Sequence, residues 1–140
     1  MAEAVFQRIL ERKHETNRFE IDSAGLLDYH QGELPDSCMR FHAEKRGYNL
    51  THQSRPVTKA DFEYFDWIIG MDDQNIRGLK QLSSNQAHAT KIRLITDFCQ
   101  HFEDTQVPDP YHGGDQGFEH VIDLLEDACE GLYKEVRGKE

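Results

Sequence analysis

The sequence predicts an α/β domain, in which a small parallel sheet carries helices on both faces. Segments with strand character alternate with segments of helical periodicity, as crossover connections between parallel strands require. The clearest strand is the run 66–71, which is almost continuously apolar between acidic residues, as in strands buried on both faces. A chain of 140 residues, 37% of them hydrophobic, suits a single domain with one core.

The helices are predicted from apolar residues three and four positions apart and from residues that begin or end a helix. Such a pattern runs from residue 2 to residue 10, where the chain opens. Gly47 is a typical residue to end a helix, and Thr58 with Asp61 resembles a capping box at the start of one. The further predicted helices cover 36–46, 59–65, 73–82 and 118–136.

Two more strands accompany the run 66–71. Residues 19–24 alternate in polarity and end at Gly25, and residues 91–95 follow the polar connection 83–90. The glycine-rich stretch 113–117 is interpreted as a flexible entry to the last helix. In open parallel sheets the ligand site lies at the carboxyl ends of the strands, so the segments after them are expected to form the site.

Composition excludes several classes of function. The formal net charge of −10 would repel nucleic acid and anionic membranes at long range. No apolar run is long enough to cross a bilayer and the first residues lack a signal-peptide core, so a cytoplasmic protein is expected. The three cysteines form no Cys-x2-Cys pair and the eight histidines no His-Glu-x-x-His motif. Neither a disulfide framework nor a metal site is predicted.

Asp109 is the strongest candidate for chemistry. It lies between Pro108 and Pro110, whose rings restrict the backbone on both sides and would hold the carboxyl group in a defined direction. Proline, aspartate and glycine also favour simple turns, and spacing alone favours that interpretation.

The surrounding residues change that balance. The segment Val107–Tyr111, followed by a glycine pair and a long acidic helix, resembles the C-terminal signature of the low molecular weight protein tyrosine phosphatases. Residues 22–25, 61–62 and 71–72 resemble other parts of that family, and the resemblance covers essentially all of the chain. It implies hydrolysis of phosphotyrosine through a cysteinyl-phosphate intermediate. Asp109 would protonate the leaving tyrosyl oxygen, then activate water.

The resemblance implies further site residues. Tyr29 and Tyr111 would form the aromatic walls that frame a phosphotyrosine ring. His52 would support the phosphate-binding loop from behind and pair with Glu3, and Ser23 would be a supporting hydroxyl. No metal or organic cofactor is implied. The implied partner is a phosphotyrosine protein, and the family's bacterial members suggest a tyrosine kinase.

The chain departs from the family at one place. The family begins with a short apolar strand and a Cys-x5-Arg loop before its first helix, whereas residues 1–140 begin at that helix. No cysteine here has arginine six positions later, so residues 1–140 are expected to be inactive, as one domain incomplete at its N-terminus. Loss of a central strand would leave unpaired edges and low stability, which dimerisation or strand swapping could rescue. Met1 is either an internal methionine taken as a start or the true start of a truncated paralogue.

Two other functions remain open. A thiol-coupled arsenate reductase shares the fold but needs redox cysteines near its site, and Cys38 and Cys99 show no such spacing. A truncated, non-catalytic paralogue would act by binding a partner. The retained Asp109 and Tyr111 argue against it, because a chain without a nucleophile has no need of a general acid.

Overall fold

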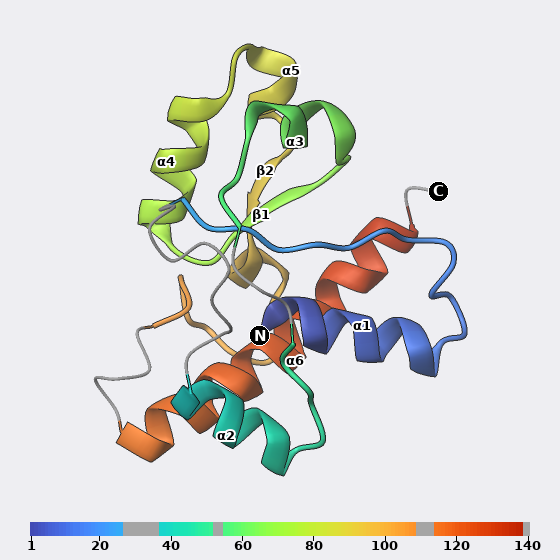
Figure 1. The fold of residues 1–140 in the computed structure, drawn as a ribbon, viewed down its shortest axis with the longest axis vertical. Helices are drawn as coiled ribbons and strands as arrows, with labels where there is room; N and C mark the ends of the chain where they lie inside the picture. The colour runs from blue at the N-terminus through green and yellow to red at the C-terminus, as the bar shows by residue number, and fades with distance from the viewer. Residues whose placement is uncertain (27–36, 52–54, 109–113, 139–140) are drawn as a thin grey trace.

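A computed structural model describes residues 1–26, 37–51, 55–108 and 114–138. Its sheet has two parallel strands in the part of the chain so described, β1 (Ile68–Gly70) and β2 (Ile92–Leu94), with Ile68 opposite Ile92. Both strands lie inside the segments predicted as strands. The parallel pairing confirms the predicted α/β class, with β1 and β2 near the middle of the molecule (Figure 1).

Different helices cover the two faces of the sheet. Ile68 and Ile92 pack with Phe62 of α3 (Lys59–Tyr64) and Leu79 of α4 (Asp73–Leu82). Ile69 packs instead against a larger cluster built by α1 (Ala2–Arg12), α2 (Ser37–Lys45) and α6 (Gly114–Arg137). Because neighbouring side chains of a strand point to opposite faces, this division confirms the predicted helical layer on each side.

The larger cluster is centred on the contact between α1 and α6, which lie against each other below the sheet in Figure 1. Leu10 of α1 is fully buried, and so are Ile122 and Leu124 of α6. The apolar face predicted for the last helix is therefore confirmed. Among the described residues, no helix combines the length and apolar character that crossing a bilayer demands.

The predicted helix boundaries are confirmed where a local signal marks them. Gly47 follows α2 with a φ of +86°, a conformation that glycine adopts without strain. The backbone N–H of Thr58 donates to Asp61 Oδ2 at 2.8 Å, which forms the expected capping interaction before α3. Asp72 caps α4 by accepting from the N–H of Asn75 at 2.8 Å.

The prediction of a strand at 19–24 is wrong for the structure as described. These residues cross the molecule as an extended chain (Figure 1) but join no ladder, and the neighbouring Gly25 makes one parallel bridge with Pro56. A strand needs a hydrogen-bonded partner along its length, and residues 19–24 border a cavity instead.

Other differences concern short or tertiary-stabilised helices. The connection 83–90 contains the one-turn helix α5 (Gln86–Ala89), capped by Asn85, and the 3-10 turn η1 (Ile95–Phe98) follows β2. The last helix begins at Gly114, so the described part of the glycine-rich stretch is helical rather than a flexible entry. Asp115 in its first turn lies 3.3 Å from the imidazole of His42, a tertiary contact that local sequence does not reveal.

Candidate functional site

A cavity of about 1040 Å³ lies between the extended segment 19–26 and β1, and residues of α1, α3, α4 and α6 also line it. Protein interiors rarely contain voids larger than a water molecule. A cavity of this size beside the sheet is therefore a candidate ligand-binding site.

Two of the predicted supporting residues meet at this cavity. Ser23 Oγ donates a hydrogen bond to Glu3 Oε1 at 2.5 Å, which ties the extended segment to the first turn of α1. Glu3 is also well placed at the N-terminus of the helix, where a negative charge is favoured. His52, the partner expected for Glu3, lies outside the described residues.

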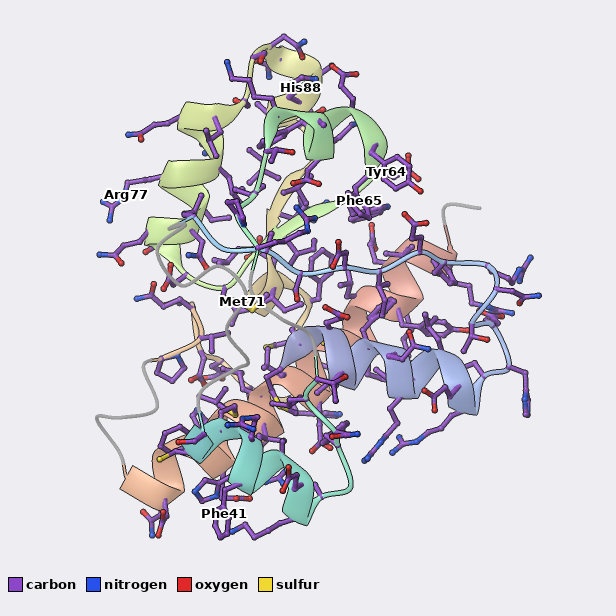
Figure 2. All side chains as sticks on the ribbon, viewed as in Figure 1. Phe41, Tyr64, Phe65, Met71, Arg77 and His88 are labelled. Atoms are coloured by element: carbon purple, nitrogen blue, oxygen red, sulfur yellow. The ribbon has the colours of Figure 1, made fainter. Side chains whose placement is uncertain are left out.

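Asp109, Tyr111 and Tyr29 also lie outside the described residues, but the chain leading to Asp109 is anchored. The N–H of Val107 donates to the carbonyl of Met71 at 2.8 Å, directly after the last residue of β1. Met71 lies near the centre of the molecule (Figure 2). The segment before Asp109 is thus held at the carboxyl end of β1, the edge where parallel sheets place ligands.

A second anchor holds the same segment. Thr96 Oγ1 donates to the carbonyl of Thr105 at 2.8 Å, and the side-chain oxygen of Gln106 accepts from the N–H of Asp73 at 3.0 Å. The first residues of α4 and the turn after β2 therefore both contact the approach to Asp109. The segment before Asp109 is thus held by three elements that end or begin at the carboxyl edge of the sheet.

Arg55 is a site residue that sequence reasoning missed. Its guanidinium donates to Asp22 Oδ2 and to Asp61 Oδ2, both at 3.0 Å, at the rim of the cavity. Burial alone would raise the pKa of Asp61, but Arg55 and the N–H of Thr58 outweigh it, and that pKa lies below its usual value. Arg55 thereby joins the extended segment to the start of α3.

A second missed cluster connects α2 and α6. His42 Nδ1 lies 2.5 Å from Glu119 Oε2, and Arg46 Nη2 donates to Glu119 Oε1 at 2.8 Å. Arg46 also contacts Asp123 at 2.8 Å and Glu126 at 2.7 Å. The sequence does contain a pattern that could have indicated this cluster: basic residues in 36–46, and acidic residues three and four positions apart on the last helix. Rules for neighbours within one helix do not predict that two separate helices pair.

None of the three cysteines forms a disulfide, and two of them are poor nucleophiles. Burial raises the pKa of Cys129 to about 12 and that of Cys99 to about 11, so both remain protonated near neutral pH. Cys38 is exposed on α2. The described residues also include no group of three or more histidine, cysteine or carboxylate side chains placed to hold a metal ion.

Comparisons with known proteins agree on one family. The family model for low molecular weight phosphotyrosine protein phosphatase matches residues 1–140. A Synechocystis protein named as a low molecular weight protein-tyrosine-phosphatase is 48% identical over 120 residues, which cover 85% of this chain and 75% of that protein. The low molecular weight protein-tyrosine-phosphatase of Streptomyces coelicolor is 34% identical over 98% of this chain and 85% of its own length.

Solved structures agree as well. The crystal structure of a protein tyrosine phosphatase from Entamoeba histolytica, with Hepes in its active site, superposes with a TM-score of 0.93. It is 44% identical in sequence, and the match covers 99% of this chain and 89% of that one. With the family model matching the full length and several relatives above 30% identity, this chain belongs to the low molecular weight phosphotyrosine protein phosphatase family.

Proposed function

We propose that this domain contributes to the hydrolysis of phosphotyrosine in proteins, with Asp109 as the general acid and Tyr29 and Tyr111 as the walls around the substrate ring. The observation that best supports this is the hydrogen bond from Val107 to Met71, which holds the approach to Asp109 at the carboxyl end of β1. Membership of a phosphotyrosine phosphatase family supports the substrate class. Following the resemblance to bacterial members, a tyrosine kinase is the proposed protein substrate.

The proposed reaction has two displacements at phosphorus. A cysteine thiolate attacks phosphorus, the bond to the tyrosyl oxygen breaks, and Asp109 gives that oxygen a proton. Asp109, now a carboxylate, takes a proton from water as the water attacks the phosphocysteine, which releases phosphate and restores the thiolate. An arginine and the backbone N–H groups of a Cys-x5-Arg loop would hold the phosphate oxygens.

We also propose that residues 1–140 alone do not catalyse this reaction. They contain no Cys-x5-Arg sequence, and the raised pKa values of Cys99 and Cys129 make both thiols unsuitable substitutes. The same two thiols weigh against thiol-coupled arsenate reduction, which needs reactive cysteines near the site. This form would instead retain the acid and the walls of a phosphatase site.

The test compares two proteins with an aryl phosphate and a phosphotyrosine peptide. Residues 1–140 are expected to show no hydrolysis above background. A fusion that places the family's short apolar strand and Cys-x5-Arg loop directly before Met1 is expected to hydrolyse both substrates and to be inhibited by vanadate. The same fusion with serine in place of the loop cysteine is the control and should be inactive.

Two outcomes would contradict the proposal. A folded fusion without activity would show that this domain does not complete a phosphatase site. Vanadate-sensitive hydrolysis by residues 1–140 would show that a nucleophile within this chain suffices. Substitution of exposed Cys38 by serine would then be the first step in finding it.

A further inference from the structure

The segment that leads to Asp109 runs along α6 before it reaches the sheet. At its start, Asp127 Oδ2 accepts from the N–H groups of 100–102. Further along, His120 in the second turn of α6 contacts Asp104. The residues that follow Asp104 contact η1, α4 and the end of β1 instead. Asp104 therefore marks the point at which the segment leaves α6 for the sheet.

The contact between His120 and Asp104 is a hydrogen bond with a definite direction. An ionised carboxylate only accepts, so Nε2 of His120 carries a proton and donates it to Asp104 Oδ2 at 2.9 Å. The imidazole also lies edge-on to the ring of Phe102, with 5.6 Å between the two centroids. The side chain of His120 is 39% exposed and that of Asp104 27%. Ion pairs this exposed contribute little to the free energy of unfolding, so any larger effect of this contact comes from where it lies.

The hydrogen bond between His120 and Asp104 encloses Asp109 in the chain. Asp104 precedes Asp109 and His120 follows it, so a bond between positions 16 residues apart closes a loop that contains the proposed acid. Among the described residues, this is the side-chain hydrogen bond between the approach to Asp109 and α6 that lies nearest to Asp109 along the chain. It therefore fixes the start of α6, on the far side of Asp109, relative to a segment that is anchored on β1.

We propose that His120 is a positioning residue for Asp109, and that its bond to Asp104 sets where the carboxyl group of Asp109 stands when the leaving oxygen is protonated. The inference rests on the proposed function, in which Asp109 is the general acid. Proton transfer requires the acid within hydrogen-bond reach of the leaving oxygen, and a misplacement of about 1 Å is enough to slow a reaction by up to roughly 10²-fold. His120 acts through the enclosed loop and takes no part in the proton transfer itself.

A purely structural role for the bond is the alternative, and two substrates with different leaving groups distinguish the two roles. If the bond only stabilised the fold, its loss would slow both substrates alike or neither of them. If the bond places the acid, its loss slows only the substrate that needs the acid. Phosphotyrosine needs it, because the tyrosyl oxygen leaves slowly without a proton, whereas an aryl phosphate with a strongly acidic phenol does not.

The first experiment uses the fusion that carries a Cys-x5-Arg loop before Met1. His120→Ala should lower kcat for a phosphotyrosine peptide by roughly tenfold and leave KM nearly unchanged, because only a transition-state interaction is weakened. The aryl phosphate should be hydrolysed as fast as by the wild type. His120→Gln should restore most of the loss, since its side-chain NH₂ group replaces the donor. His101→Ala, at an exposed histidine of the same segment, is the control and should leave kcat unchanged.

Asp104 provides a second test of the same bond. Asp104→Ala should cause the same loss as His120→Ala, and the double variant should lose no more than either single variant, because one bond is removed in all three. Asp104→Asn keeps an acceptor oxygen and should keep most of kcat. Circular dichroism checks that each variant folds.

Fluorine NMR of residues 1–140 gives a measurement that needs no catalysis. Tyr111 follows Asp109 within the enclosed loop. With 3-fluorotyrosine in place of the five tyrosines, the substitution Tyr111→Phe identifies its resonance. His120→Ala should shift this resonance, because the loop loses the bond that closes it, whereas His101→Ala should not.

Three results would overturn the inference. A kcat for phosphotyrosine that is unchanged in His120→Ala, or that falls equally with both leaving groups, would mean that His120 does not act through the acid. Additive losses in the double variant would mean that the two side chains act separately. A Tyr111 resonance unaffected by His120→Ala would mean that the bond does not position the segment. Failure of the proposed function is seen separately, as a wild-type fusion without activity.

Discussion

His42 Nδ1 lies 2.5 Å from Glu119 Oε2, and this contact joins the last turn of α2 to the second turn of α6. Arg46, one turn after His42, donates to the other oxygen of the same carboxylate at 2.8 Å. The stretch that contains Tyr29 precedes α2, and the stretch that contains Asp109 precedes α6. Glu119 therefore fixes the distance between the two helices that follow the predicted substrate-binding segments.

The first prediction concerns this carboxylate. Glu119→Gln should lower the free energy of unfolding by about 1 kcal/mol at pH 7, a value reduced because the side chain is 33% exposed. Hydrogen bonds from Arg46 and then His42 lower the pKa of Glu119 from 4.5 to about 2. A depressed folded-state pKa gives stability that is complete above pH 4.5 and is lost as the pH falls towards 2.

Urea unfolding at a series of pH values between 7 and 2 tests this. The difference in stability between the wild type and Glu119→Gln should shrink from pH 4.5 downwards. Glu11→Gln on the exposed side of α1 is the control and should stay within about 0.5 kcal/mol of the wild type at pH 7. A difference that is constant with pH would show that the carboxylate charge of Glu119 does not stabilise the fold.

The second prediction concerns Asp127, a nearly buried residue of α6. Its Oδ2 accepts from the N–H groups of Gln100, His101 and Phe102 at 2.9–3.2 Å, while Oδ1 is buried and accepts no hydrogen bond from the described residues. Asp127→Ala would leave three donors without their acceptor and should cost roughly 2–3 kcal/mol in chemical denaturation. Asp127→Asn keeps one acceptor oxygen and should lower the free energy of unfolding by less than Asp127→Ala does. An equal loss in the two variants would mean that the charge of Asp127, and not its acceptor oxygen, stabilises the fold.

The third prediction concerns Gly131 in the interior of α6. Replacing glycine by alanine inside a helix ordinarily stabilises it by about 1 kcal/mol. A Cβ at Gly131 would lie 1.8 Å from the backbone carbonyl oxygen of Phe98, so α6 and η1 would have to separate. Gly131→Ala should therefore lower Tm by several degrees. Gly138→Ala, where the nearest atom would be 3.3 Å away, is the control and should change Tm little.

The sequence predicted those parts of the fold that local signals determine. The capping pair Thr58 and Asp61, the terminating Gly47 and the apolar run that contains β1 each act within a few residues. The strand expected at 19–24 depended on a partner, and no local rule supplies one.

In the candidate site, too, local motifs were predicted from the sequence and tertiary contacts were not. Asp109 was predicted from a motif, and both its role and its environment stay predictions. Glu3 and Ser23 were expected as supporting residues, yet their direct hydrogen bond joins positions 20 residues apart and was not foreseen. The pairs of Arg55 with Asp22 and of Arg46 with Glu119 were missed, because ion pairs across 33 and 73 residues follow only from the packed fold.

The last prediction concerns catalysis by the fusion that carries a Cys-x5-Arg loop before Met1. Asp109→Asn keeps the shape of the side chain but removes the proton that the leaving oxygen needs, so kcat for phosphotyrosine peptide should fall by roughly 10²–10⁴-fold. Tm should change little, since asparagine has nearly the same size and shape as aspartate. Asp97→Asn, at an exposed position of η1, is the matched control and should leave kcat unchanged.

Substrates whose leaving groups differ in acidity distinguish a general acid from a residue that only positions the substrate. For an aryl phosphate whose phenol is strongly acidic, expulsion needs little protonation, so the loss of kcat in Asp109→Asn should be much smaller than with phosphotyrosine. A residue that merely shaped the pocket would slow both substrates alike. Equal losses with the two leaving groups would therefore refute the assignment of Asp109 as the acid, even if the variant were strongly impaired.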